Sequence, residues 1–281
     1  MWGSVLRLSA RQQPHLLAPP PPGPGVCAVC LTPIPGGRLC HRCRAQPRAA
    51  DSVLAISYSP HDGALHAMLR DYKATGRAAR SLRVALSAVL WRFLDSHERC
   101  LAAAAAASRR GAAPAFDTVC IVPSTRRQPA VAHPLVSVLA AVEPVAPRLQ
   151  AGLLEPSITG AERAFDPRRF RCARPLEHRS VLLVDDTWTT GASAQSAAAA
   201  LKRAGAGVVG VLVIGRHVHA DYGSNRAWLS GLEHRFEWDR CARCEQAVRC
   251  RGASPRALAV GERDGSGDAS GSRVRLEDRG A

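Results

Sequence analysis

The run VLLVDDTWTTGAS at residues 181–193 constrains the fold of this chain more than any other feature. Four apolar residues lead directly into Asp185 and Asp186, as in a strand that is buried on both faces and ends at the edge of a parallel sheet. An alanine-rich helix over residues 193–204 and an apolar strand over residues 208–214 follow. Strand, helix and strand in this order predict a parallel α/β sheet with right-handed crossovers.

The hydropathy pattern predicts further elements of the same fold class on the amino-terminal side. Two apolar runs are typical of strands, two segments have helical spacing, and a fifth segment fits one long helix or a broken pair. They are residues 52–59 and 117–122, residues 63–72 and 130–142, and residues 78–109. Residues 143–180, called the hood below, show no sustained hydrophobic periodicity. This indicates a long excursion of the chain over the site that the run at residues 181–193 would form.

A chain of 281 residues is long enough for one main core with small additions. Residues 1–25 and 252–281 are rich in proline or glycine without periodicity, so we expect a disordered leader and a disordered tail. Residues 26–50 hold four cysteines in a segment too short for its own core. The main α/β domain is expected over residues 51–251.

Four of the ten cysteines form the motifs CAVC and CHRC, nine residues apart. Two CxxC pairs at this spacing supply the four thiolates of a tetrahedral Zn²⁺ site, and a metal would organise a segment that lacks a core. A redox pair is the alternative. The predicted ligands are Cys27, Cys30, Cys40 and Cys43.

A weaker group of cysteines lies near the carboxyl end. Cys241, Cys244 and Cys250 are one ligand short of a metal site, which His234 or Cys172 could complete. We interpret them as unpaired thiols, with a second metal as the alternative. Two further cysteines, Cys100 and Cys120, are interpreted as buried packing residues.

The formal net charge of +15 suits polyanions such as phosphates, nucleic acid or an acidic partner surface. Arginine supplies almost all of it, because Lys73 and Lys202 are the only lysines, and a GC-rich genome would produce the same bias. No run approaches the length of a membrane span and no export signal is visible, so a cytoplasmic protein without membrane contact is expected.

The run at residues 181–193 also predicts a ligand. Adjacent carboxylates at the carboxyl end of a central strand are costly unless they meet hydroxyls or a cation, and a ribose diol with Mg²⁺ nearby offers both. The turn that follows opens a helix, whose first amide groups attract anions. Gly191 permits close approach of the backbone, and the hydroxyls of Thr189, Thr190 and Ser193 can donate to phosphate. An ordinary turn between strand and helix is the alternative.

This run resembles the 5-phosphoribosyl 1-diphosphate signature of type I phosphoribosyltransferases. The resemblance implies that Asp185 and Asp186 hold the ribose hydroxyls. It assigns the 5-phosphate to five loop residues, Thr189, Thr190, Gly191, Ala192 and Ser193. Several members have an acid at the position of Thr189 that acts as a base toward a nucleobase, which threonine cannot do at neutral pH, so purine salvage is not expected.

Over residues 27–218 the chain is similar to the ComF family, which is linked to competence and DNA uptake. The matching parts are the four-cysteine module, Tyr58 with LHAMLRDYKATG, the turn IVPSTRR, and in the hood Gln150, ERAFD and Phe170. The resemblance implies that Arg126 with Arg127, and Arg163, contact the diphosphate. Solvent-exposed arginines are the alternative for the pair.

Two functions follow from this resemblance. The first is an enzyme that binds Mg²⁺ and 5-phosphoribosyl 1-diphosphate and transfers the phosphoribosyl group to an acceptor that the sequence does not identify. The second is a non-catalytic module that engages single-stranded DNA or competence proteins, for which aromatic platforms are scarce. Trp188 is a candidate for stacking in either function, or an anchor of its loop.

Overall fold

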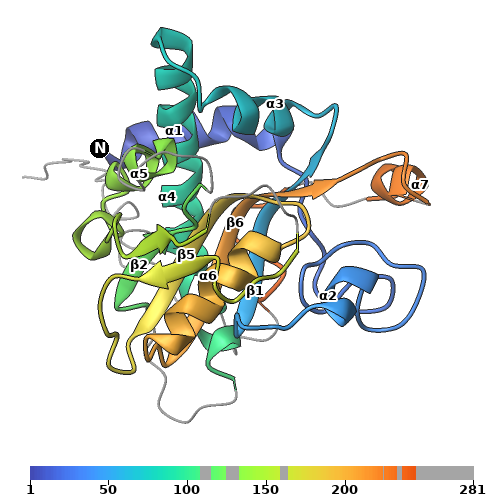
Figure 1. The fold of residues 1–281 in the computed structure, drawn as a ribbon. Coiled ribbons are helices and arrows are strands. Elements are labelled where there is room, and N and C mark those ends of the chain that lie inside the picture. Colours follow the sequence, from blue (N-terminus) through green and yellow to red (C-terminus); the bar gives the residue numbers. More distant parts are fainter. Residues whose placement is uncertain (108–114, 125–132, 159–163, 224, 233–235, 245–281) are drawn as a thin grey trace, which may run out of the picture. The chain divides into compact units, whose positions relative to one another are not determined.

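The runs predicted as strands pair into one parallel sheet in the computed structural model of the chain (Figure 1). The structure describes residues 1–281 except for 108–114, 125–132, 159–163, 224, 233–235 and 245–281. The sheet has the order β1-β6-β5-β2, formed by β1 (Ser52–Pro60), β6 (Val208–Val218), β5 (Ser180–Trp188) and β2 (Thr118–Ile121). The predicted α/β class with a parallel sheet is therefore confirmed.

The strands of this sheet differ in length, and the difference shapes its carboxyl edge. β2 ends at Ile121, which pairs with Val184 of β5. β5 continues beside β6 alone, as far as the pair Trp188 and Arg216. Among the described residues, the part of β5 that follows Val184 therefore has no strand partner on the side where β2 has stopped.

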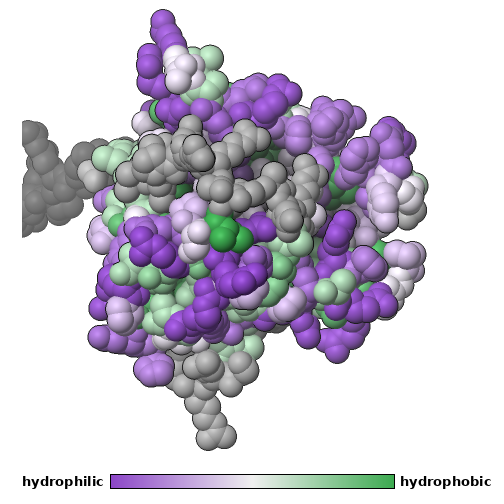
Figure 2. Space-filling view, in the orientation of Figure 1, coloured by the Kyte–Doolittle hydropathy of each residue, from purple (hydrophilic) through white to green (hydrophobic). Residues whose placement is uncertain are grey.

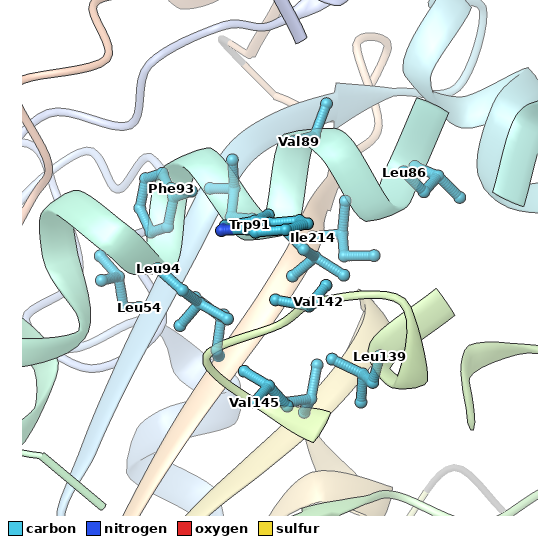
Figure 3. Packing of buried hydrophobic residues seen from close by; sticks show 14 of the residues in the cluster. Leu54, Leu86, Val89, Trp91, Phe93, Leu94, Leu139, Val142, Val145 and Ile214 are labelled. Atoms are coloured by element: carbon cyan, nitrogen blue, oxygen red, sulfur yellow. The ribbon is translucent and has the colours of Figure 1, made fainter. Parts of the chain in front are cut away.

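Successive side chains of the strands point to opposite faces of the sheet and enter two separate cores. On β5, Leu182 and Val184 join the core shared with the long helix α4 (Arg77–Ala105), while Val181 and Leu183 join the core shared with α6 (Ala192–Arg203). Figure 3 shows the first core, with side chains of α4 against Leu54 and Ile214 of the sheet. A three-layer arrangement of helix, sheet and helix results.

The remaining helices are shorter. On the face of α4 lie α3 (Ala64–Asp71) and α5 (Pro134–Ala140). The short helix α2 (His41–Ala45) begins inside the second CxxC motif, with Cys40 as its N-cap, and α7 (Asn225–Ser230) follows β6. The segment predicted as one long helix or a broken pair forms the single helix α4 over its described part. The hood contains the short 3-10 helix η3 (Ala146–Arg148) and a small antiparallel pair of strands, β3 (Leu154–Pro156) and β4 (Phe170–Cys172).

The prediction of a disordered leader over residues 1–25 is wrong for its first half. Residues Trp2–Gln12 form α1, which packs on α4, and the short turn η1 (Gln13–His15) follows. Val5 is buried and the ring of Trp2 lies 6.0 Å from that of Trp91. The proline-rich string begins only after this helix, so composition averaged over 25 residues concealed its apolar stripe.

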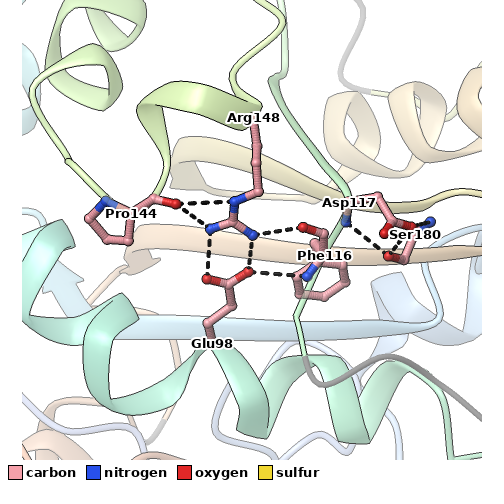
Figure 4. A network of polar contacts seen from close by, with 6 residues as sticks. All are labelled: Glu98, Phe116, Asp117, Pro144, Arg148 and Ser180. Atoms are coloured by element: carbon pink, nitrogen blue, oxygen red, sulfur yellow. Dashed lines mark hydrogen bonds and ion pairs between the residues drawn. The ribbon is translucent and has the colours of Figure 1, made fainter. Parts of the chain in front are cut away.

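A buried polar network fixes the amino-terminal end of β2 against α4 (Figure 4). The Arg148 guanidinium forms two hydrogen bonds to the Glu98 carboxylate, at 2.5 and 3.0 Å, and also donates to the carbonyls of Phe116 and Pro144. The backbone N–H of Phe116 donates to the same carboxylate. These contacts join three segments that lie far apart in the sequence: α4, the residues before β2 and the residues around Arg148.

Residues Met1–Cys250 form one compact unit, so the four-cysteine segment packs with the α/β sheet. The predicted tail over residues 252–281 lies outside the described residues. Within the described part, every helix is too short or too polar to cross a lipid bilayer.

Candidate functional site

The paired acids lie on the part of β5 that extends past the end of β2. Asp186 is buried, with 5% of its surface exposed, and its Oδ2 accepts a hydrogen bond of 2.5 Å from the Tyr72 hydroxyl. Nζ of Lys73 lies 2.6 Å from the same oxygen. A buried carboxylate requires such partners, and the turn after α3 supplies both.

Asp185 is half-buried beside Asp186. Burial and the neighbouring Asp186 carboxylate raise the pKa of Asp185 to about 8, against the opposing charge of Lys73. One of its oxygens accepts the backbone N–H of Asp186 at 2.9 Å. The raised pKa means that burial disfavours the ionised form of Asp185. Ligand hydroxyls or a cation would stabilise that form, which is the chemistry predicted for the pair.

The loop after β5 turns sharply into α6. Gly191 adopts the left-handed conformation, with φ 80° and ψ 0°, and precedes the first residue of the helix. A side chain at this position would clash, because a Cβ would lie 2.1 Å from the Trp188 ring. Glycine also has no side chain to cap the helix, and the Ala192 N–H donates to Oγ1 of Thr190 at 3.3 Å. Backbone amides at the amino end of a helix such as α6 are the partners that an anion requires.

Trp188 is an anchor of this loop. Its side chain is 1% exposed and packs in the core on the α6 face, so it offers no surface for stacking. The guanidinium of Arg216, itself buried, donates to the carbonyls of Trp188 and Thr189 at 3.0 and 3.2 Å. The anchoring role of Trp188, one of its two predicted roles, is therefore confirmed, whereas the supporting cation Arg216 was identified by neither composition nor motif.

The hood contributes a second arginine to the same place. Arg169 is 5% exposed, and its guanidinium lies 3.3 Å from Oγ of Ser193 while also donating to the carbonyl of Ala164. The backbone N–H of Asp166 is bonded to Oγ of Ser196 on α6. The hood therefore places a fixed positive charge at the amino end of α6, where an anion would gain from it.

The residues predicted to form or flank the site fall into three groups. The structure brings together Asp185, Asp186 and the loop residues Thr189, Thr190, Gly191, Ala192 and Ser193. Arg126, Arg127 and Arg163 lie outside the described residues. Tyr58 and Phe170 are buried packing residues, and Gln150 accepts a hydrogen bond from Arg174.

The four sulfurs of Cys27, Cys30, Cys40 and Cys43, the first cysteine cluster, lie within 4.8 Å of one another. Sγ of Cys30 is 3.7 Å from that of Cys40, and the backbone N–H of Cys43 points to the Cys40 sulfur at 3.4 Å. Hydrogen bonds from the neighbouring thiols hold the pKa of Cys27 far below its ordinary value. Four such thiols could hold a metal such as zinc, as the spacing predicted.

This cluster is in contact with the ligand loop. Nε2 of Gln46 donates to the carbonyl of Thr190 at 3.0 Å, and Arg216 donates to the carbonyl of Cys30 at 3.1 Å. Oε1 of Gln195, near the start of α6, accepts the N–H groups of Ala49 and Ala50. The folding of the four-cysteine segment and the shape of the loop are therefore linked.

The carboxyl-terminal cysteines are arranged differently from the prediction of unpaired thiols. Cys241 and Cys244 meet His97 and Cys100 of α4, and the four ligand atoms lie within 4.8 Å of one another. Cys100 therefore does more than fill the core. Cys172 is not in this group, and Cys250 and His234 lie outside the described residues.

No family model, curated protein or solved structure matches the chain.

Proposed function

We propose that the chain binds 5-phosphoribosyl 1-diphosphate at the carboxyl end of β5, in a sheet of the type I phosphoribosyltransferase kind. The observation that supports this most is the direct succession of Asp185 and Asp186, on the part of β5 that extends past β2, and left-handed Gly191 at the start of α6. A diol site and an anion site then lie one loop apart, as a phosphorylated ribose requires.

Each part of such a ligand has a partner among the described residues. Asp185 and Asp186 would accept hydrogen bonds from the two ribose hydroxyls. The backbone from Thr189 to Ser193 and its hydroxyls would hold the 5-phosphate, with Arg169 next to Ser193 offsetting the charge. Lys73, which neutralises Asp186 in the absence of ligand, is placed to turn toward a diphosphate.

Mg²⁺ fits the carboxylate oxygens of this edge, and when bound it would offset the charge of the diphosphate. Transfer of the phosphoribosyl group to an acceptor would require the site to hold the ribose carbon in place while the diphosphate leaves. Arg126 and Arg163 remain the predicted contacts of that leaving group. Tyr72 and Lys73 position Asp186, which orients the ribose.

Zinc in the first cysteine cluster would have a structural role in this proposal. The donor set consists of four thiols at metal-binding distances, and no substrate group is needed to complete it. Through Gln46 and Arg216 the segment supports the loop that would hold the phosphate. This connection favours a ComF-like role, in which the four-cysteine segment and the ligand site act together.

Binding of single-stranded DNA or of competence proteins is the second candidate, supported by the net charge of +15. Hydrophilic residues cover much of the face drawn in Figure 2. The burial of Trp188 removes the stacking platform considered in the sequence, so DNA affinity would depend on arginines and fall steeply with salt.

Release of diphosphate separates the two candidates. The purified chain is incubated with 5-phosphoribosyl 1-diphosphate, Mg²⁺ and candidate acceptors, and diphosphate is measured over time. Acceptor-dependent release that disappears in Asp185→Asn would support the enzyme. Binding of the ligand without diphosphate release by any acceptor would support the non-catalytic module. Absence of ligand binding would overturn both the proposed ligand and the proposed transfer.

A further inference from the structure

Two residues of α4 and two residues near the carboxyl end form a second group of metal-ligand atoms, called the His97 cluster. His97 and Cys100 are three residues apart on α4 and share one helix face, while Cys241 and Cys244 form a CxxC knuckle. Nothing in the proposed phosphoribosyl site uses these residues.

The distances within the His97 cluster match a tetrahedral metal site. With Zn–S near 2.3 Å and Zn–N near 2.0 Å, a tetrahedron has S···S edges of roughly 3.8 Å and N···S edges of roughly 3.5 Å. The sulfur of Cys244 lies 3.5 Å from that of Cys241 and 4.0 Å from that of Cys100. Nδ1 of His97 lies 3.6 Å from the Cys100 sulfur and 3.7 Å from the Cys244 sulfur.

The surroundings orient these ligands toward one point. His97 is 1% exposed, and its Nε2 lies 3.0 Å from the carbonyl of Trp238. If Nε2 carries the proton and donates it there, Nδ1 presents a lone pair to the sulfurs, as in histidine ligands that bond a carbonyl with the opposite nitrogen. The backbone N–H groups of Cys241 and Arg243 point to the sulfurs of the knuckle at 3.1 and 3.4 Å.

We propose that His97, Cys100, Cys241 and Cys244 form a second structural zinc site, with one nitrogen and three sulfur ligands. Cys100 also takes part in a disulfide in the structure. A sulfur in a disulfide cannot act as a thiolate ligand, so this disulfide and the metal exclude each other, and the zinc form is that of the reduced protein.

The location of the site explains why a metal is needed. Residues 236–244 contain neither helix nor strand, yet Phe236, Trp238 and Ala242 are buried in the core shared with α4. Within this segment the backbone hydrogen bonds are turn contacts, from the Arg240 N–H to the Glu237 carbonyl and from the Cys244 N–H to the Cys241 carbonyl, so regular secondary structure does not offset its conformational entropy. Four bonds to a metal would fix this segment to α4.

Arg243 extends the effect of the site to the first cysteine cluster. It lies inside the Cys241–Cys244 knuckle, is 5% exposed, and donates to the carbonyls of Ala28 and Val29 inside the CAVC motif and to that of Val53 on β1. The two cysteine clusters are therefore joined by one buried guanidinium. Zinc in the His97 cluster would hold this bridge in place.

Zinc content of the reduced full-length chain tests the proposal directly. The protein is purified with a phosphine reductant and without chelator, and zinc per chain is measured in the wild type and in Cys241→Ser with Cys244→Ser. We expect the double variant to lose about one zinc per chain. The matched control, Cys172→Ser, removes a free thiol outside both clusters and should retain the full content.

Zinc X-ray absorption of the wild type needs no variant and covers the case in which the double variant does not fold. Two occupied sites predict about two zinc per chain and an average shell between three and four sulfurs, with a histidine contribution. One zinc with three sulfurs and one histidine would leave this proposal intact and contradict zinc in the first cluster. One zinc with four sulfurs, or equal zinc in the double variant and wild type, would overturn it.

Discussion

The Tyr72 hydroxyl donates a 2.5 Å hydrogen bond to Oδ2 of Asp186, joining the residue after α3 to the carboxyl end of β5. Tyr72 is fully buried, and burial together with the charge of Asp186 raises the pKa of its hydroxyl well above the ordinary value. Tyr72 therefore remains a neutral donor at physiological pH. One carboxylate of the candidate site is fixed before any ligand arrives.

Replacement of Tyr72 by phenylalanine should reduce stability, because Asp186 would lose a partner that it cannot replace with water. A hydrogen bond to a charged group contributes about 1.5–3 kcal/mol, so we expect the free energy of unfolding to fall by that amount. Urea unfolding followed by circular dichroism measures it. Tyr222→Phe is the control, since that side chain is 78% exposed. Equal midpoints for the two variants would contradict the role given to Tyr72.

The sequence predicted the sheet because its apolar runs are continuous and bounded by turn residues. β1, β5 and β6 lie where residues 52–59, 181–184 and 208–214 predicted them, although β5 extends to Trp188. That extension could not be foreseen, since it depends on pairing with β6 past the end of β2. α1 was missed because the neighbouring prolines dominated the composition of the leader.

The candidate site was predicted in its acids and its loop but not in its supports. Asp185, Asp186 and Gly191 are consecutive features of one motif, whereas Arg169 and Arg216 reach the loop from other segments. Arg216 carries a signal, an arginine among apolar neighbours in GVLVIGRHV, where a buried charge needs a specific partner. Arg169 lies among other arginines in DPRRFRC and carries no such signal. The His97 cluster likewise joins residues about 140 apart in sequence, which spacing rules do not detect.

The Arg148 and Glu98 pair should be among the most important polar contacts for stability. Arg148→Met would leave a buried carboxylate without its cation and remove the donor to Phe116 and Pro144, so we expect a loss of about 3–5 kcal/mol. Arg171→Met breaks an exposed pair with Glu155 and should cost less than about 1 kcal/mol. Chemical denaturation of both variants makes the comparison, and similar losses would refute this ranking.

Gln46 transmits the fold of the four-cysteine segment to the ligand loop. Gln46→Ala removes the hydrogen bond to the Thr190 carbonyl and should weaken binding of 5-phosphoribosyl 1-diphosphate by roughly five-fold, equivalent to about 1 kcal/mol. Zinc content should be unchanged. Titration calorimetry is the measurement, with Gln12→Ala on α1 as the control. Equal affinity in both variants would show that Gln46 does not couple the four-cysteine segment to ligand binding.

Four histidines gather at the carboxyl ends of β1 and β6, where the ring of His66 lies 4.9 Å from that of His61 and 5.0 Å from that of His217. Partial burial, followed by the charges of His61 and Arg70, lowers the pKa of His66, and burial and His66 lower that of His217. The unfolded chain then binds more protons near pH 6, so stability rises with pH in that range.

We therefore expect the melting temperature to fall as the pH is lowered from about 7 toward 5.5, and to fall less in His66→Gln. Comparison of variant with wild type at each pH cancels the other titrating groups. His15→Gln, at an exposed position, should follow the wild type. If His66→Gln showed the full acid dependence, the cluster would not be the cause.

Binding of 5-phosphoribosyl 1-diphosphate with Mg²⁺, measured by calorimetry, tests the central claim most directly. The account predicts binding by the wild type, a loss of at least about 100-fold in Asp185→Asn with Asp186→Asn, equivalent to roughly 3 kcal/mol, and unchanged affinity in Asp239→Asn, an exposed acid outside the site. Circular dichroism confirms that the double variant is folded. Wild-type affinity in a folded double variant, or no binding by the wild type, would contradict the account.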